Sequence, residues 1–150
     1  MIEVKNIQKS FDSKIIIQDV SAVMKAGQCN LIIGASGSGK TVLMKCMVGL
    51  FDPDHGSILY GGHDFTAMEG RDKTEIRKEI GMLFQGSALF DSQNVEQNIM
   101  FPLSMFTDWT YKKKLDRVNE VLNRVNLPDV NRKFPAELRG SIKKRVALAR

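Results

Sequence analysis

The chain has 150 residues, of which 22 are Lys or Arg and 17 are Asp or Glu, giving a formal net charge of +5; 43% are hydrophobic. This composition is typical of a globular domain and excludes a disordered or collagen-like chain. Two cysteines and two separated histidines provide neither a disulfide framework nor zinc-ligand spacing. No stretch approaches the ~20 apolar residues of a membrane span, and the first ten residues lack the apolar core of a signal peptide. We therefore expect a reducing, cytosolic setting.

The positive charge does not predict a nucleic-acid partner. The basic runs at 111–114 and 143–145 both lie on helical patterns, where a solvated helix face is the simpler explanation. Aromatic residues are not interleaved with base-binding polar residues, as they are in proteins that stack on single strands. We expect no nucleic acid among the partners.

The first third of the chain predicts strands. Apolar and polar residues alternate over 2–5, and apolar residues recur from 15 to 23, which favours half-exposed antiparallel strands. Leu31–Ile33 is a continuous apolar run followed by glycine, as expected of a strand buried on both faces of a parallel sheet. Residues 40–50 are apolar around most of a helical circumference and predict a buried helix.

The middle of the chain alternates turns with further elements. Turn residues at 52–56 precede a predicted strand over Ser57–Tyr60. A polar, helix-compatible stretch near 74–78 leads into Ile80–Phe84, which is a second candidate for a buried strand.

The last third predicts helices. Apolar residues spaced by 4, 3, 4 and 3 indicate an amphipathic helix over 111–125, with Asp108 or Thr110 as its N-cap. Ser141 is the expected N-cap of a final helix, which reaches Arg150 without a terminating Gly or Pro and therefore looks cut.

Residues 34–41, GASGSGKT, satisfy the phosphate-loop pattern G-x-x-x-x-G-K-[ST] between a predicted strand and a predicted helix. The glycines let the main chain bend close to phosphate oxygens, and the helix start adds N–H groups and a positive dipole end. Lys40 is placed to reach the β- and γ-phosphates, and the Thr41 hydroxyl to ligate Mg²⁺. We predict a magnesium-bound nucleoside triphosphate as ligand. The predicted binding residues are Gly34, Ala35, Ser36, Gly37, Ser38, Gly39, Lys40 and Thr41.

A phosphate loop indicates a ligand but not a reaction. Around it, KSF at 9–11, the glutamine that follows IGMLF at 80–84, and FPAEL followed by KKRVALAR at 143–150 resemble the ATP-binding cassette (ABC) ATPases along the whole chain. The resemblance implies that Phe11 stacks on adenine and that Gln85 contacts the metal and the attacking water. The pattern alone fits a core aromatic at the first position and a solvated strand end at the second equally well.

The resemblance also implies the architecture and the chemistry. It implies an α/β P-loop NTPase core with an antiparallel β edge over 1–93 and an inserted helical subdomain over 94–150, truncated at the C-terminus. ATP and Mg²⁺ are the implied cofactors. Lys40 and Gln85 are the implied catalytic residues, and Thr41 and Gln85 the implied metal contacts.

For function, the resemblance implies the ATP-binding subunit of an ABC transporter, peripheral at the cytoplasmic face of the inner membrane through a transmembrane permease. A second ATPase subunit would complete a nucleotide sandwich. Within the family, GMLFQGSALFDS at 81–92 is most similar to lipid-trafficking importers of the Mla type that work with MCE-domain proteins, which implies phospholipid as cargo. We expect Met100–Phe106 to pack within the helical region in preference to forming a groove for the permease.

The sequence departs from the family pattern at the signature, where Leu-Ser-Gly-Gly is replaced by Leu138, Arg139, Gly140 and Ser141. The arginine removes a phosphate-binding hydroxyl but brings a cation, and Ser141 adds a side chain where glycine allows close approach. We expect a weakened nucleotide sandwich. The carboxylate strand (Walker B) and the switch histidine of the family do not occur before Arg150, so we expect the chain to bind ATP without hydrolysing it alone. Leu31–Ile33 would then also lack a covering strand.

Two other functions stay open. A non-catalytic nucleotide-binding module is favoured by the altered signature and the missing carboxylates. A small P-loop kinase would need arginines on a lid, and Arg71 and Arg77 are the nearest candidates but show no lid pattern.

Overall fold

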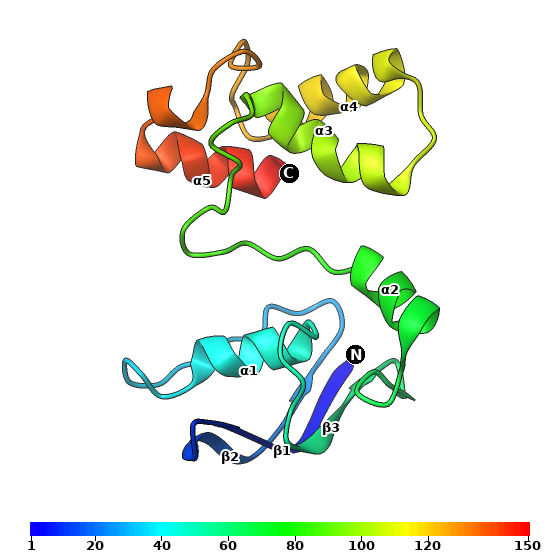
Figure 1. The fold of residues 1–150 in the computed structure, drawn as a ribbon, viewed down its shortest axis with the longest axis vertical. Helices are drawn as coiled ribbons and strands as arrows, with labels where there is room; N and C mark the ends of the chain where they lie inside the picture. The colour runs from blue at the N-terminus through cyan, green and yellow to red at the C-terminus, as the bar shows by residue number, and fades with distance from the viewer. The chain divides into compact units, whose positions relative to one another are not determined.

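The computed structural model describes residues 1–150, which divide into two compact units, Met1–Gly81 and Met82–Arg150. Figure 1 shows that the first unit holds the sheet and the second is helical. The functional domains predicted over 1–93 and 94–150 stay a prediction. None of the helices combines the length and the apolar composition that a bilayer crossing requires.

The first unit is built on an antiparallel sheet with the strand order β2-β1-β3-β4. Its strands are β1 (Ile2–Phe11), β2 (Lys14–Met24), β3 (His55–Tyr60) and β4 (His63–Asp64). Asp12 and Ser13 join β1 to β2 with φ of 46° and 64°, the two left-handed positions of a type I′ hairpin turn. The predicted antiparallel strands and the mixed α/β class are confirmed.

Helix α1 (Lys40–Met47) buries Leu43 and Cys46 in a core with Val4, Ile7, Ile17 and Ile58 of the sheet. The prediction of a helix buried all round and extending to residue 50 was wrong. Met44 is 46% exposed, because α1 packs on one sheet face only, and Leu50, which is 51% exposed, lies beyond the end of the helix at Met47. The helix ends near Gly49, whose φ of 71° is left-handed.

The two predicted buried strands are also corrected. Leu31–Ile33 and Ile80–Phe84 form no strand, and the residues Leu31 and Ile33 are 78% and 84% exposed. A parallel strand forms only when neighbouring strands supply hydrogen bonds on its edges, and no strand of residues 1–150 pairs with either run. Within this run Ile32 is half-buried and packs against the core of the first unit, whereas Leu31 and Ile33 are exposed.

The polar stretch near 74–78 does form a helix, α2 (Gly70–Lys78), which has no buried residue. Lys73 pairs with Asp52 at 2.9 Å, and the Arg77 guanidinium donates to the carbonyl of Gly49. Arg77 therefore ties α2 to the end of α1.

The second unit contains three α-helices and one short 3₁₀ helix around a core of its own. They are α3 (Val95–Phe106), α4 (Tyr111–Arg124), η1 (Pro135–Glu137) and α5 (Gly140–Ala149). The core side chains are Val95, Ile99, Val118, Leu122, Leu127, Val130, Leu138 and Val146. The predicted stripe on α4 is confirmed at its centre, although Tyr111 at its start is 62% exposed. Of the two candidate caps, Thr110 is the N-cap, and its hydroxyl accepts from the amide of Lys113.

The start of α5 differs from the prediction. Arg139 occupies the N-cap position with extended backbone, and the helix begins at Gly140, so Ser141 lies in the first turn and caps nothing. The carbonyl of Arg139 accepts from the amides of Ile142 and Lys143 at 2.9 and 3.0 Å. These are the first main-chain hydrogen bonds of the helix, and no side chain caps it. Of the segment Met100–Phe106, which forms most of α3, Met100 and Leu103 pack on the core while Met105 and Phe106 are exposed.

Candidate nucleotide-binding site

Residues 34–41 form a bend that leads directly into α1. Gly39 immediately precedes the helix with φ 86° and ψ 1°, and Gly37 has φ 78°. A Cβ on Gly39 would lie 2.9 Å from the carbonyl oxygen of Ile16 in β2, whereas a Cβ on Gly37 would meet nothing within 4 Å. Both glycines are needed for a left-handed backbone, and Gly39 is needed also because β2 passes so close.

The Lys40 ammonium folds back over the loop. Its Nζ donates to the carbonyl oxygens of Gly34 and Ala35 at 2.8 and 2.7 Å, and the amide of Ser38 donates to Ala35 at 3.2 Å. The first turn of α1 leaves its amide N–H groups without intrahelical acceptors and aims the positive dipole end the same way. The Lys40 ammonium and the N-terminal end of α1 therefore lie at the same loop.

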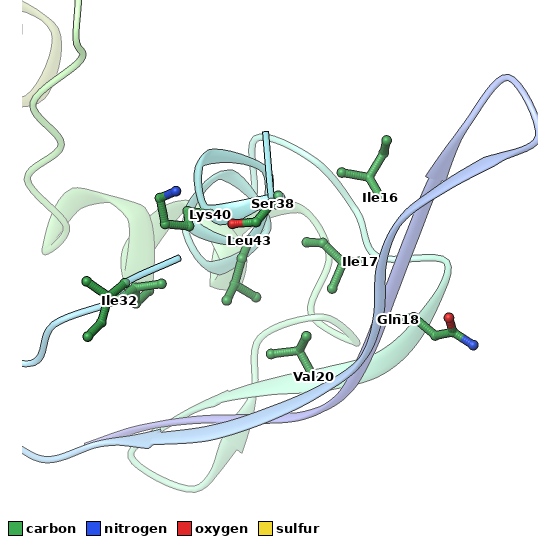
Figure 2. A pocket seen from close by; sticks show the side chains of 10 residues that line it. Ile16, Ile17, Gln18, Val20, Ile32, Ser38, Lys40 and Leu43 are labelled. Atoms are coloured by element: carbon green, nitrogen blue, oxygen red, sulfur yellow. The ribbon is translucent and has the colours of Figure 1, made fainter. Parts of the chain in front are cut away.

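The loop borders two adjoining pockets. A pocket of about 180 Å³ is lined by residues 37–42 and Ile16. A second, of about 340 Å³, has a polar end at Ser38 and Lys40 and is otherwise lined mainly by apolar side chains of β2, Ile32 and Leu43 (Figure 2). Amides, an ammonium and hydroxyls beside an apolar wall fit the phosphate tail of a nucleotide.

Thr41 lies in the first turn of α1 with an exposed side chain, which suits a hydroxyl that contacts a phosphate-bound Mg²⁺. No group of three or more His, Cys, Asp and Glu side chains in residues 1–150 is arranged to hold a metal ion.

Phe11 ends β1 and is 39% exposed, so it is not a buried core aromatic. Its ring meets that of Phe51 edge to face, with centroids 5.2 Å apart, and the Lys9 ammonium lies 5.4 Å from its centroid. Gln85 is exposed in an irregular segment of the second unit. Its predicted role rests on the family resemblance alone.

Asp54 fastens the segment after α1 to the end of β1. Its carboxylate accepts from the Lys9 ammonium at 2.7 Å and from the Ser10 amide at 2.6 Å. The hydrogen bonds from Lys9 and Ser10 hold the pKa of Asp54 below its ordinary value of 3.8.

This shift predicts a pH dependence. Because the folded-state pKa is lowered, Asp54 contributes stability above its ordinary value of 3.8 and loses it as the pH falls through the lower folded value. We expect Asp54→Asn to have a lower Tm than the wild type at pH 7, with the gap closing below pH 3.8. Thermal unfolding followed by circular dichroism at several pH values measures this. An equal gap at pH 7 and pH 2.5 would contradict it.

Asn98 is a structural residue that sequence reasoning missed. Its side chain is fully buried, accepts from the amide of Phe90 at 2.8 Å, and donates to the carbonyls of Phe90, Gln93 and Asn94. Arg150 holds the same segment from another side, because its guanidinium donates to the carbonyl of Ala88 at 2.6 Å. The segment that follows Gln85 is thus fixed by side chains. The sequence signals this role only weakly, since Asn98 directly precedes the apolar Ile99.

Asn98→Ala is expected to destabilise the protein by ~3 kcal/mol, because it removes the hydrogen bonds of a fully buried amide side chain and leaves the amide of Phe90 and the carbonyl of Gln93 without these partners. Urea unfolding of the full chain measures this. Asn123→Ala, at an exposed position of α4, is the matched control and should change stability by less than ~0.5 kcal/mol. Equal effects of the two substitutions would refute the role of Asn98.

The fold and the loop together are those of a P-loop α/β protein. Residues 17–150 match the family described as ABC transporter (ABC_tran), and the chain belongs to this family. The resemblance to the ABC ATPases is thereby confirmed.

Two curated relatives illustrate the relationship. The chain is 42% identical over 149 residues to the probable ribonucleotide transport ATP-binding protein mkl of Mycobacterium leprae, covering 99% of this chain and 43% of that protein. It is 38% identical over 152 residues to the methionine import ATP-binding protein MetN of Clostridium acetobutylicum, covering 100% of this chain and 47% of that protein. The chain thus spans less than half the length of these relatives.

Solved structures agree. A structure described as a dimer of MJ0796, a bacterial ABC transporter cassette, matches with a TM-score of 0.90 and 26% identity, covering 99% of this chain and 68% of that one. A second structure of MJ0796, a dimer in a post-hydrolysis state bound to ADP and Pi, matches with a TM-score of 0.89 and 25% identity over 99% of this chain and 68% of that one.

Proposed function

We propose that this chain supplies the phosphate-binding part of the ATP-binding subunit of an ABC transporter, which couples the binding and hydrolysis of MgATP to transport. The observation that carries the proposal is the convergence of the Lys40 ammonium, the left-handed Gly39 and the start of α1 on one loop. Membership of the ABC transporter family supports it, since the ATPase domain of that family binds ATP, normally with Mg²⁺.

In this proposal the carbonyls of Gly34 and Ala35 give up the Lys40 ammonium to phosphate oxygens, while the amides of residues 37–41 donate to the same phosphates. Thr41 contacts Mg²⁺, which neutralises phosphate charge. Gln85 orients the attacking water, and Phe11 stacks on the adenine. The amides, ammonium and hydroxyls that border the loop suit binding of phosphate better than activation of water, so we propose that the chain alone binds ATP more readily than it hydrolyses it.

Phosphate release separates this function from its alternatives. The transporter subunit releases phosphate from MgATP at a rate that its reconstituted transmembrane permease stimulates. A nucleotide sensor releases none, and a small kinase transfers phosphate only when an acceptor is added. Release that the permease leaves unchanged overturns the proposal.

The proposed setting follows from the function. The subunit would lie peripherally at the cytoplasmic face of the inner membrane, held by the permease, and would dimerise with a second ATPase subunit. The relatives named above are ATP-binding proteins of transport systems, and the solved MJ0796 cassettes are dimers.

The signature residues predict a weak dimer. Arg139 and Ser141 are both exposed at the start of α5, where the proposed partner's nucleotide would lie. In a full-length, hydrolysis-blocked protein, the double substitution Arg139→Ser and Ser141→Gly should strengthen the MgATP-dependent dimer about tenfold, because one charge-assisted hydrogen bond to phosphate is worth ~1.5 kcal/mol. Light scattering with MgATP measures the dimer. Dimers of equal strength with and without the substitutions would count against this prediction.

A more specific proposal concerns the transported substrate. Similarity of residues 81–92 to Mla-type lipid-trafficking importers supports phospholipid. The names of the two relatives instead mention ribonucleotide transport and methionine import. Stimulation of the reconstituted ATPase by phospholipid alone would support the lipid proposal, and stimulation by methionine or a ribonucleotide would overturn it.

A further inference from the structure

Phe11 owes its position to residues that follow α1. Phe51 is half-buried against the core of the first unit, and its ring stands at 69° to that of Phe11 with centroids 5.2 Å apart. An edge-to-face pair at this distance is favourable and restricts both rings. Phe11 is not enclosed by these contacts, since the residue stays 39% exposed.

Phe51 is itself held from the α1 side. Its amide donates to the carbonyl of Lys45 at 3.2 Å, and the Lys45 ammonium lies 5.1 Å from the Phe51 ring centroid. Helix α1 therefore joins the phosphate loop, at its start, to Phe51 just beyond its end.

Asp54 contacts the residues of β1 that precede Phe11. Its carboxylate holds Lys9 and the Ser10 amide, and its own amide donates to the carbonyl of Gln8 at 2.8 Å. Lys9 is in turn close to the Phe11 ring. Asp54 thus contacts the three residues before Phe11, Lys9 and Ser10 through its carboxylate and Gln8 through its main-chain amide.

We propose that Phe51 and Asp54 are positioning residues that hold the Phe11 ring in place for the nucleotide base. This inference rests on the proposed function, in which Phe11 stacks on adenine. It assigns to residues 51–54 a role in affinity for the base, separate from the phosphate loop's affinity for the triphosphate.

Calorimetric titration of the full chain with two ligands, MgATP and magnesium tripolyphosphate, tests the proposal, because only the first ligand carries a base. We expect Phe51→Leu to weaken ATP about threefold to tenfold and leave tripolyphosphate unchanged, as Phe11→Ala does. Phe51→Tyr keeps the ring and should restore ATP affinity. Asp54→Asn should act in the same direction as Phe51→Leu. Phe101→Leu, which breaks the similar edge-to-face pair with Phe90, is the matched control and should alter neither affinity.

The outcomes are distinct. A wild-type chain that binds neither ligand overturns the proposed function and this inference with it. A wild-type chain that binds both ligands, with Phe51→Leu and Asp54→Asn leaving ATP affinity unchanged or weakening both ligands equally, overturns this inference and leaves the proposed function standing. Unchanged ATP affinity in Phe11→Ala also overturns it.

Discussion

Gly39→Ala is expected to destabilise the protein by about 2–5 kcal/mol and to abolish ATP binding. The substitution forces an alanine to φ 86° and drives its Cβ to 2.9 Å from the Ile16 carbonyl oxygen. Left-handed strain costs about 1–2 kcal/mol, and overpacking against a main-chain atom about 1–3 kcal/mol. The loop can relieve the contact only by moving away from β2, which also displaces the amides at the start of α1. Urea unfolding and calorimetric titration with MgATP measure the two effects.

Gly37→Ala is the matched control for that substitution. Gly37 shares the left-handed backbone with φ 78°, but a Cβ there meets nothing within 4 Å. Its cost should therefore be the strain alone, about 1–2 kcal/mol. If both alanine variants lose the same stability, the close approach of β2 to Gly39 is not what the loop depends on.

Lys40→Ala is expected to weaken MgATP binding about 100-fold. The ammonium donates to the loop carbonyls of Gly34 and Ala35 at 2.8 and 2.7 Å, and in the proposed complex it donates to phosphate oxygens instead. Hydrogen bonds between charged groups contribute about 1.5–3 kcal/mol each, and 1.4 kcal/mol is a factor of ten in affinity. Calorimetry at constant ionic strength measures the loss, since screening by salt changes any charge effect.

Lys25→Ala controls for net charge. Lys25 is exposed in the turn after β2, and its removal changes the charge of the chain by the same amount. We expect its affinity for MgATP to stay within twofold of the wild type. Equal losses in the two variants would show that Lys40 acts only through the overall charge.

Elements that depend on local pattern were predictable. The antiparallel strands at the start of the chain, the helix near 74–78 and the central stripe of α4 are confirmed, because alternation and helical spacing act over neighbouring residues. The runs Leu31–Ile33 and Ile80–Phe84 have strand-like composition but form no strand. A strand buried on both faces needs partners from elsewhere in the chain, which composition cannot supply.

The candidate site likewise combines features that the local sequence predicts with features that depend on tertiary contacts. The bend at Gly39 and the place of Lys40 follow from a motif of eight consecutive residues. The contacts of Phe51 with Phe11 and of Asn98 with Phe90 join parts of the chain through tertiary packing and left no comparable signal. The phosphate loop is therefore predictable from the sequence, whereas the supporting residues Phe51 and Asn98 are not.

The central claim is that the main chain and ammonium of residues 34–41 bind the triphosphate of MgATP. Amide NMR spectra of the full chain, labelled with ¹⁵N and titrated with MgATP, test it most directly. The account predicts that the largest shifts fall on the amides of Gly37, Ser38, Gly39 and Lys40, and that Lys40→Ala removes them. Saturating MgATP that shifts other amides and leaves these four unchanged would contradict it.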